Sequence, residues 1–109
     1  GKVFGVEIIK ELFEISKKNL KGYKNAKVFW KDGRLGFKEK SPYDRIIISA
    51  ATEDIPKPLV SQLKEKGIIV APIGKSYEFS QSLVSYEKIK GKLTEREKHE
   101  GFIFVPLIG

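Results

Sequence analysis

The sequence predicts an α/β domain built around a mixed β-sheet. Two uninterrupted apolar runs, at residues 46–48 and 68–71, are typical of parallel strands that helices bury on both faces. From residue 81 onward, polar and apolar side chains instead alternate around the turn at residues 90–92, which indicates an antiparallel hairpin. Strand-helix-strand units followed by antiparallel strands predict layers of helix and sheet within one domain.

The first strand-helix-strand unit spans residues 2–30. Residues 2–7 have a strand pattern, and Gly22 ends the helix that follows. The side chains of that helix that share one face are Ile9, Leu12, Phe13, Ser16 and Leu20. Residues 26–30 form the next strand, and residues 32–42 are expected to be a loop because they are rich in Gly and charged residues. The aromatic residues expected in the core are Phe29, Trp30, Phe102 and Phe104.

The second unit follows the central strand at residues 46–48. Pro56 and Pro58 fit only the first turn of a helix, and Lys66-Gly67 is expected to end it. The apolar face of this helix is formed by Leu59, Val60 and Leu63. We therefore expect one domain over residues 1–109, in which residues 1–74 supply the strand-helix units and residues 75–109 supply antiparallel strands.

The chain is basic, with a formal net charge of +7. Its Lys and Arg residues are scattered along the chain and mostly alternate with Glu. Nucleic-acid surfaces need clustered basic residues interleaved with aromatic ones, so the pattern favours a solvated surface. A basic RNA- or DNA-binding module is kept as an alternative function.

Several chemistries are disfavoured by the residue inventory. The chain has no Cys, and its one His, His99, stands in a charged segment, so neither thiol catalysis nor a metal site is expected. The hydroxyl groups of Ser49 and Thr52 have no general base near them in the sequence, which argues against a Ser-His-acid hydrolase. Apolar runs are far shorter than the roughly 20 residues that cross a bilayer, and the chain begins without a signal-peptide pattern, so we expect a cytoplasmic protein with no membrane partner.

Two acidic residues stand where neighbouring strands end. Ligands of open α/β sheets bind at the carboxyl ends of the strands, where Glu7 can accept the two hydroxyls of a ribose. Asp32 can accept an adenine amino group, while Gly33 allows close approach to the backbone. Each acid also has a purely structural interpretation. Glu7 can be an acid at the beginning of a helix, and Asp32-Gly33 can be a common turn dipeptide. Together the two acids predict an adenosine ligand.

The central stretch also resembles a known family. Residues 43–51, 55–59 and 62–64, and the GIIVAPIG segment at residues 67–74, closely resemble protein-L-isoaspartate O-methyltransferases. Further matching blocks lie at residues 6–7, 12, 19–20, 22–25, 32–33 and 104–109. The resemblance spans essentially the whole chain but only the C-terminal half of the family.

The resemblance implies a class I S-adenosylmethionine-dependent methyltransferase with a Rossmann-like mixed sheet that lacks the first strand and the glycine loop. Such enzymes repair damaged proteins by esterifying the free carboxylate of L-isoaspartyl residues. Matched by position, Glu7 corresponds to the ribose ligand and Asp32 and Gly33 to adenine contacts. The wall of the cofactor site corresponds to Ala50 and Ala51, and the strand that receives the substrate peptide corresponds to Val105, Pro106 and Leu107. The catalytic hydroxyl residue of the family lies in its N-terminal half, so no catalytic residue is assigned here.

The resemblance has a structural consequence. In the family a strand lies between the one that ends at Glu7 and the one that ends at Ser49, and its loss leaves a gap of roughly 10 Å. We expect one of three outcomes: the chain is part of a longer protein and inactive alone, it borrows a strand from another copy, or the two flanking strands pair directly. A methyltransferase with another acceptor is a further alternative.

Overall fold

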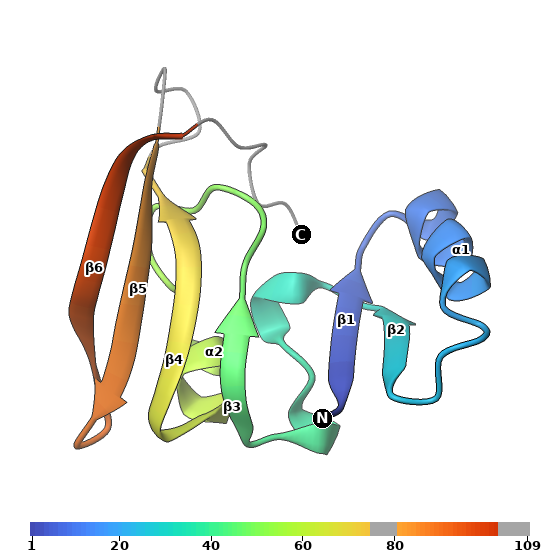
Figure 1. Ribbon diagram of the computed structural model, residues 1–109, viewed down its shortest axis with the longest axis horizontal. Coiled ribbons are helices and arrows are strands. Elements are labelled where there is room, and N and C mark those ends of the chain that lie inside the picture. Colours follow the sequence, from blue (N-terminus) through green and yellow to red (C-terminus); the bar gives the residue numbers. More distant parts are fainter. Residues whose placement is uncertain (75–80, 103–109) are drawn as a thin grey trace.

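A computed structural model describes residues 1–74 and 81–102 of the chain. The elements alternate strand and helix in the first part and then continue as strands (Figure 1). In order they are β1 (Val3–Glu7), α1 (Lys10–Asn19), β2 (Ala26–Trp30), the single-turn 3-10 helices η1 (Gly33–Leu35) and η2 (Lys38–Lys40), β3 (Tyr43–Ile47), α2 (Lys57–Gln62), β4 (Leu63–Ile73), β5 (Gln81–Ile89) and β6 (Lys92–Phe102).

The first sheet has two parallel strands, β1 and β2, joined by α1. Val3 pairs with Ala26 and Glu7 with Trp30, so the strands are in register along their full length. Lys17 and Lys18 lie in the last turn of α1, where positive charge is favourable. The strand-helix-strand unit predicted for residues 2–30 is therefore present.

The second sheet has the order β3-β4-β5-β6, with β3 parallel to β4 and the later pairs antiparallel. The turn between β5 and β6 contains Lys90 and Gly91, both with positive φ, which matches the twist of a two-residue hairpin. The carboxylate of Glu65 accepts hydrogen bonds from the backbone amides of both turn residues. The mixed sheet and its C-terminal hairpin are thus confirmed, and the charged segment around His99 is itself part of β6.

The two sheets do not join. Within residues 1–74 and 81–102, β1 pairs with β2 alone and β3 with β4 alone, so the facing edges of β1 and β3 are open (Figure 1). Direct pairing of these strands, one of the three outcomes expected above, does not occur. Aromatic rings bridge the sheets instead: Phe4 of β1 lies 6.3 Å from the Tyr43 ring of β3 and 6.1 Å from the Phe37 ring, between ring centroids.

The core lies between α2 and one face of the second sheet. It is formed by Ile48, Leu59, Leu63, Ile69 and Ala71. Among the described residues no element packs on the other face of β3, where Ile47 is 78% exposed. The prediction that the run at residues 46–48 is buried on both faces is therefore wrong. Side chains of a strand alternate between faces, and in the described part of the chain α2 covers only the face of Ile48.

Three smaller expectations also need correction. The second helix ends at Gln62 rather than at Lys66-Gly67, because the chain is already extended at Leu63, whose carbonyl oxygen accepts a hydrogen bond from Lys88. The loop after Asp32 contains two helical turns. Trp30 is not a core residue: it is 54% exposed because it lies at the end of β2, which is an edge strand. The expectation for Phe104 lies outside the described residues.

Candidate functional site

Glu7 and Asp32 lie at the same edge of the first sheet. Glu7 is the last residue of β1 and pairs with Trp30, the last residue of β2, two positions before Asp32. The backbone amide of Lys31 donates to the Glu7 carbonyl oxygen at 3.1 Å. Because the two strands are parallel, both acids follow carboxyl ends at one edge, where ligands of open α/β sheets bind.

The Glu7 carboxylate lies at the beginning of α1. Its Oε1 atom accepts a hydrogen bond from the backbone amide of Ile9 at 3.2 Å, and the positive end of the helix favours the negative charge there. The indole Nε1 of Trp30 donates to the Ile8 carbonyl oxygen at 2.9 Å. The turn after β1 is therefore held from both sides. No other hydrogen bond to this carboxylate occurs among the described residues, so Oε2 can accept a donor from a ligand.

Asp32 begins the loop that follows β2. Its Oδ1 accepts from the backbone amide of Arg34 at 2.9 Å, which caps η1, and its Oδ2 accepts from Arg34 Nη2 at 2.9 Å. The side-chain hydrogen bonds of Arg34 lower the pKa of Asp32 below its ordinary value. Asp32 is therefore ionised at neutral pH and can accept a hydrogen bond from an amino group.

Gly33 lies against β1. A Cβ atom at this position would meet Val6 Cγ2 at 3.5 Å, which is an ordinary van der Waals contact. Packing within the chain therefore does not require glycine here. The need for close ligand approach at Gly33 remains a prediction.

Ala50 and Ala51 follow the end of β3. Figure 1 shows β1, β2 and β3 pointing the same way, so the turn after β3 lies at the same end of the strands as the turns after β1 and β2. Ala51 is buried. The neighbouring Thr52 donates its backbone amide to the Pro72 carbonyl oxygen at 3.0 Å, which attaches this turn to the end of β4.

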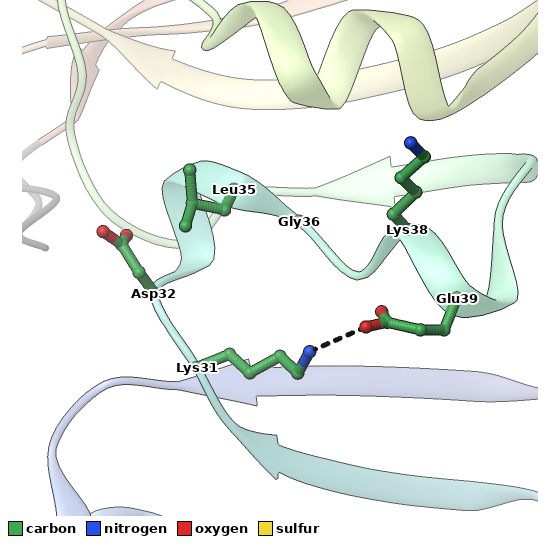
Figure 2. Close-up of a pocket in the computed structure, with 6 residues that line it drawn as sticks. All are labelled: Lys31, Asp32, Leu35, Gly36, Lys38 and Glu39. Atoms are coloured by element: carbon green, nitrogen blue, oxygen red, sulfur yellow. Dashed lines mark hydrogen bonds and ion pairs between the residues drawn. The ribbon is translucent and has the colours of Figure 1, made fainter.

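A hollow of about 300 Å³ adjoins Asp32 (Figure 2). It is lined by Lys31, Asp32, Leu35, Gly36, Lys38 and Glu39. Lys31 Nζ and Glu39 Oε1 form an ion pair of 3.1 Å across it. The sequence indicates neither this hollow nor the contact of Gln62 in α2 with its loop, where the Gln62 amide bonds to Leu35 and Phe37. A loop rich in Gly and charged residues has no regular pattern from which such a contact could be predicted.

The remaining predicted residues fall elsewhere. Val105, Pro106 and Leu107 lie outside the described residues. The side chain of His99 is solvent-exposed on β6, and its Nε2 lies 3.5 Å from Glu97 Oε2. In the described ranges no group of three or more His, Cys, Asp or Glu side chains is placed to hold a metal ion. No helix within these ranges has both the length and the apolar character needed to span a membrane.

Comparison with known proteins decides the family. The family model described as protein-L-isoaspartate(D-aspartate) O-methyltransferase matches residues 1–109. The chain belongs to this family. Among curated members, the protein-L-isoaspartate O-methyltransferase of Methanococcus maripaludis is 48% identical over 111 residues, and that of Pyrococcus horikoshii is 46% identical. Each alignment covers 100% of this chain but 50% of the relative, so the chain spans half the length of the family members it matches.

Solved structures agree with this membership. One protein-L-isoaspartate O-methyltransferase superposes with a TM-score of 0.91 at 31% identity, over 100% of this chain and 35% of its own. A second, from Plasmodium falciparum, has a TM-score of 0.75 at 28% identity and was solved with S-adenosyl-L-homocysteine; 52% of that chain is covered. An S-adenosylmethionine-dependent methyltransferase from Clostridium acetobutylicum, 11% identical, shares the fold with a TM-score of 0.51. The α/β fold is thus that of S-adenosylmethionine-dependent methyltransferases.

Proposed function

We propose that this chain is the nucleoside-binding half of an enzyme that transfers a methyl group from S-adenosylmethionine to the free carboxylate of L-isoaspartyl residues in damaged proteins. The observation that carries the proposal is the placement of Glu7 and Asp32 after adjacent parallel strands at one sheet edge, in a chain that matches this family throughout. Isoaspartyl-containing proteins are then its substrates, protein repair its role, and the cytoplasm its compartment.

The residues fit an adenosine group by their chemistry. Glu7 offers a carboxylate oxygen to the ribose hydroxyls, and the ionised Asp32 offers one to the adenine amino group. The backbone at Gly33 approaches the adenine ring, and the turn at Ala50 and Ala51 forms a small-residue wall beside it. Two carboxylates at one sheet edge thus recognise donor groups at the two ends of a single nucleoside.

The proposed reaction needs no general base from this chain. Bound S-adenosylmethionine supplies a methyl group on a positively charged sulfur. The accepting carboxylate is already ionised near neutral pH, so no general base is needed, and orientation and exclusion of water supply the acceleration. This fits the exposed position of His99, which lies on the outer strand β6. In this proposal Val105, Pro106 and Leu107 hold the substrate peptide.

Completion of the sheet belongs to the same proposal. The amide of Val3 points toward β2 and that of Ile48 toward β4. Because successive amides of a strand alternate in direction, those of Phe4 and Ile47 point into the open space between β1 and β3. We propose that a strand from an N-terminal half, or failing that from a second copy of the chain, pairs with both edges. The rest of the added half packs on the face of the sheet that exposes Ile47.

Calorimetric titration with S-adenosylhomocysteine tests the function. The chain is measured alone and joined to the unmatched half of the Methanococcus maripaludis relative. Glu7→Gln removes the charged acceptor and is expected to weaken binding by about tenfold or more, because hydrogen bonds to charged groups contribute about 1.5–3 kcal/mol. Glu14→Gln on the exposed side of α1 is the matched control and leaves affinity unchanged. Absence of binding in both forms, or equal affinity of the two variants, contradicts the proposal.

A further inference from the structure

Gln62, in the last turn of α2, is a buried polar residue whose amide oxygen and nitrogen each form a hydrogen bond to one loop. Only 5% of the residue is exposed. Its Oε1 atom accepts a hydrogen bond from the backbone amide of Phe37 at 2.9 Å, and its Nε2 atom donates to the Leu35 carbonyl oxygen at 2.9 Å. The side chain thus holds the loop backbone on both sides of Gly36.

Gly36 is shaped to receive this amide. Its φ is +66°, in the region that favours glycine, and a Cβ atom there would lie 2.2 Å from Gln62 Oε1 and 2.9 Å from Leu59 Cδ2. Gln62 is buried and bonded at both of its polar atoms, so it has no easy way to move aside. The loop backbone approaches the amide this closely only because residue 36 lacks a side chain.

The loop held by Gln62 begins at Asp32. The amide of Leu35 donates to the Asp32 carbonyl oxygen at 3.0 Å, so one helical turn separates the held carbonyl from the acid (Figure 2). On the other side, the ring of Phe37 stacks on that of Phe29 in β2, with 4.1 Å between centroids. The two sheets share no strand pairing among the described residues, so side chains attach the loop after Asp32 to the second sheet. Gln62 does so from α2, and the Tyr43 hydroxyl of β3 adds a hydrogen bond to the Phe37 carbonyl oxygen.

We propose that Gln62 is a positioning residue for adenine recognition: it holds the turn at Asp32 and Gly33 where the Asp32 carboxylate meets the adenine amino group. The proposal rests on the function proposed above. It assigns to Gln62 no contact with the ligand. Gln62 is expected to affect the preference for adenine over a base that lacks the amino group, and not the affinity for the ribose.

The test compares S-adenosylhomocysteine with S-inosylhomocysteine, in which an oxygen replaces the adenine amino group. The wild-type protein, in the form that binds in the titration above, is expected to prefer the adenine ligand by about tenfold, the effect of a hydrogen bond to a charged group. Gln62→Leu removes both loop hydrogen bonds and is expected to reduce this preference to less than twofold. A general loss of stability lowers binding of both ligands and leaves their ratio unchanged.

Lys88→Met is the matched control. Lys88 Nζ donates to the carbonyl oxygens of Val60 and Leu63, so this variant also loses two hydrogen bonds at the end of α2 but leaves the loop untouched. It is expected to keep the full adenine preference. An unchanged preference in Gln62→Leu, or an equal loss in Lys88→Met, overturns the proposal while leaving the proposed function intact.

A second variant guards against misfolding. Gln62→Met keeps nearly the same size and buries no charge, but it loses both hydrogen bonds to the loop. The same fall in adenine preference supports the proposal, and full retention overturns it. If wild-type protein binds neither ligand, the proposed function fails and this inference fails with it.

Discussion

The indole Nε1 of Trp30 donates a hydrogen bond of 2.9 Å to the carbonyl oxygen of Ile8. The single tryptophan of the chain is therefore attached to the turn that directly follows Glu7. Its ring also lies beside Phe13 of α1, with 6.5 Å between centroids, and under the ammonium of Lys10. We therefore expect a ligand that binds the Glu7 carboxylate to alter the surroundings of this indole.

We expect the intrinsic fluorescence of Trp30 to report ligand binding. Titration with S-adenosylhomocysteine should change its emission with the same dissociation constant as calorimetry gives. Trp30→Phe keeps the ring packing but loses the hydrogen bond to Ile8, and should weaken binding by a few-fold, corresponding to about 1 kcal/mol. Tyr23→Phe, at an exposed position, is the control. Unchanged affinity in Trp30→Phe contradicts a role for this contact in holding the turn.

Arg34 controls the ionisation of Asp32. In Arg34→Ala the pKa of Asp32 is expected to rise toward its ordinary value, because the side-chain hydrogen bonds that lower it are lost. A carbon-detected NMR titration of Asp32 measures this directly. Arg45→Ala, whose guanidinium donates only to the Asp44 carbonyl oxygen among the described residues, is the control and should leave the pKa of Asp32 unaltered.

The lowered pKa of Asp32 is expected to make the folded protein less stable in acid. The folded-state pKa of Asp32 lies below its unfolded value, which is about 3.9. The stability contributed by Asp32 is therefore complete above the unfolded pKa and is lost as the pH falls through the folded pKa. Melting temperatures between pH 2 and 6 should show a steeper acid loss for wild type than for Arg34→Ala. Parallel melting-temperature curves for the two proteins would show that the Asp32-Arg34 ion pair contributes nothing to stability.

Lys88 is expected to stabilise the end of α2. Its ammonium donates to the carbonyl oxygens of Val60 and Leu63 at 2.8 and 2.9 Å. Lys88→Met should lower the free energy of unfolding by about 2 kcal/mol, since the carbonyls lose a charged donor in a partly buried setting. Chemical denaturation measures the change. Lys92→Met, an exposed lysine at the start of β6, should change it by less than about 0.5 kcal/mol.

Substitution of Ile47 tests whether an added half covers the exposed face of β3. Because its side chain is exposed, Ile47→Thr should change the stability of this chain by less than about 0.5 kcal/mol. In the chain joined to the unmatched half of the Methanococcus maripaludis relative, the same change should cost about 1–2 kcal/mol, because the isoleucine becomes buried. An equally small effect in both forms would show that the added half does not cover this face.

Elements whose own residues repeat in a regular pattern could be predicted from the sequence. The helical spacing from Ile9 to Leu20 and the alternation beyond residue 81 identified α1 and the β5-β6 hairpin, because each depends on a repeat within its own segment. The position of Glu7 and Asp32 at one edge followed from the strand order. Ile47 and Trp30 were misjudged because an apolar residue in a strand does not reveal whether anything covers it.

The site was harder to predict where it depends on distant contacts. Gln62 binds the loop after Asp32 through Phe37, and the two residues are 25 positions apart in the sequence. No local pattern in the sequence indicates such a distant partner. Gly36 offered a partial signal, since glycine in a loop indicates either a positive φ or close approach of other atoms, and here it has both. The early end of α2 similarly depends on Lys88, which comes from a different strand.

A crystal structure of the protein with S-adenosylhomocysteine would show directly whether Glu7 and Asp32 bind one nucleoside. If the chain alone does not bind, the structure uses this chain joined to the unmatched half of the Methanococcus maripaludis relative. We expect the ribose hydroxyls within hydrogen-bond distance of the Glu7 carboxylate and the adenine amino group within the same distance of Asp32. A nucleoside bound elsewhere, or one that touches only one of the two acids, would contradict this expectation.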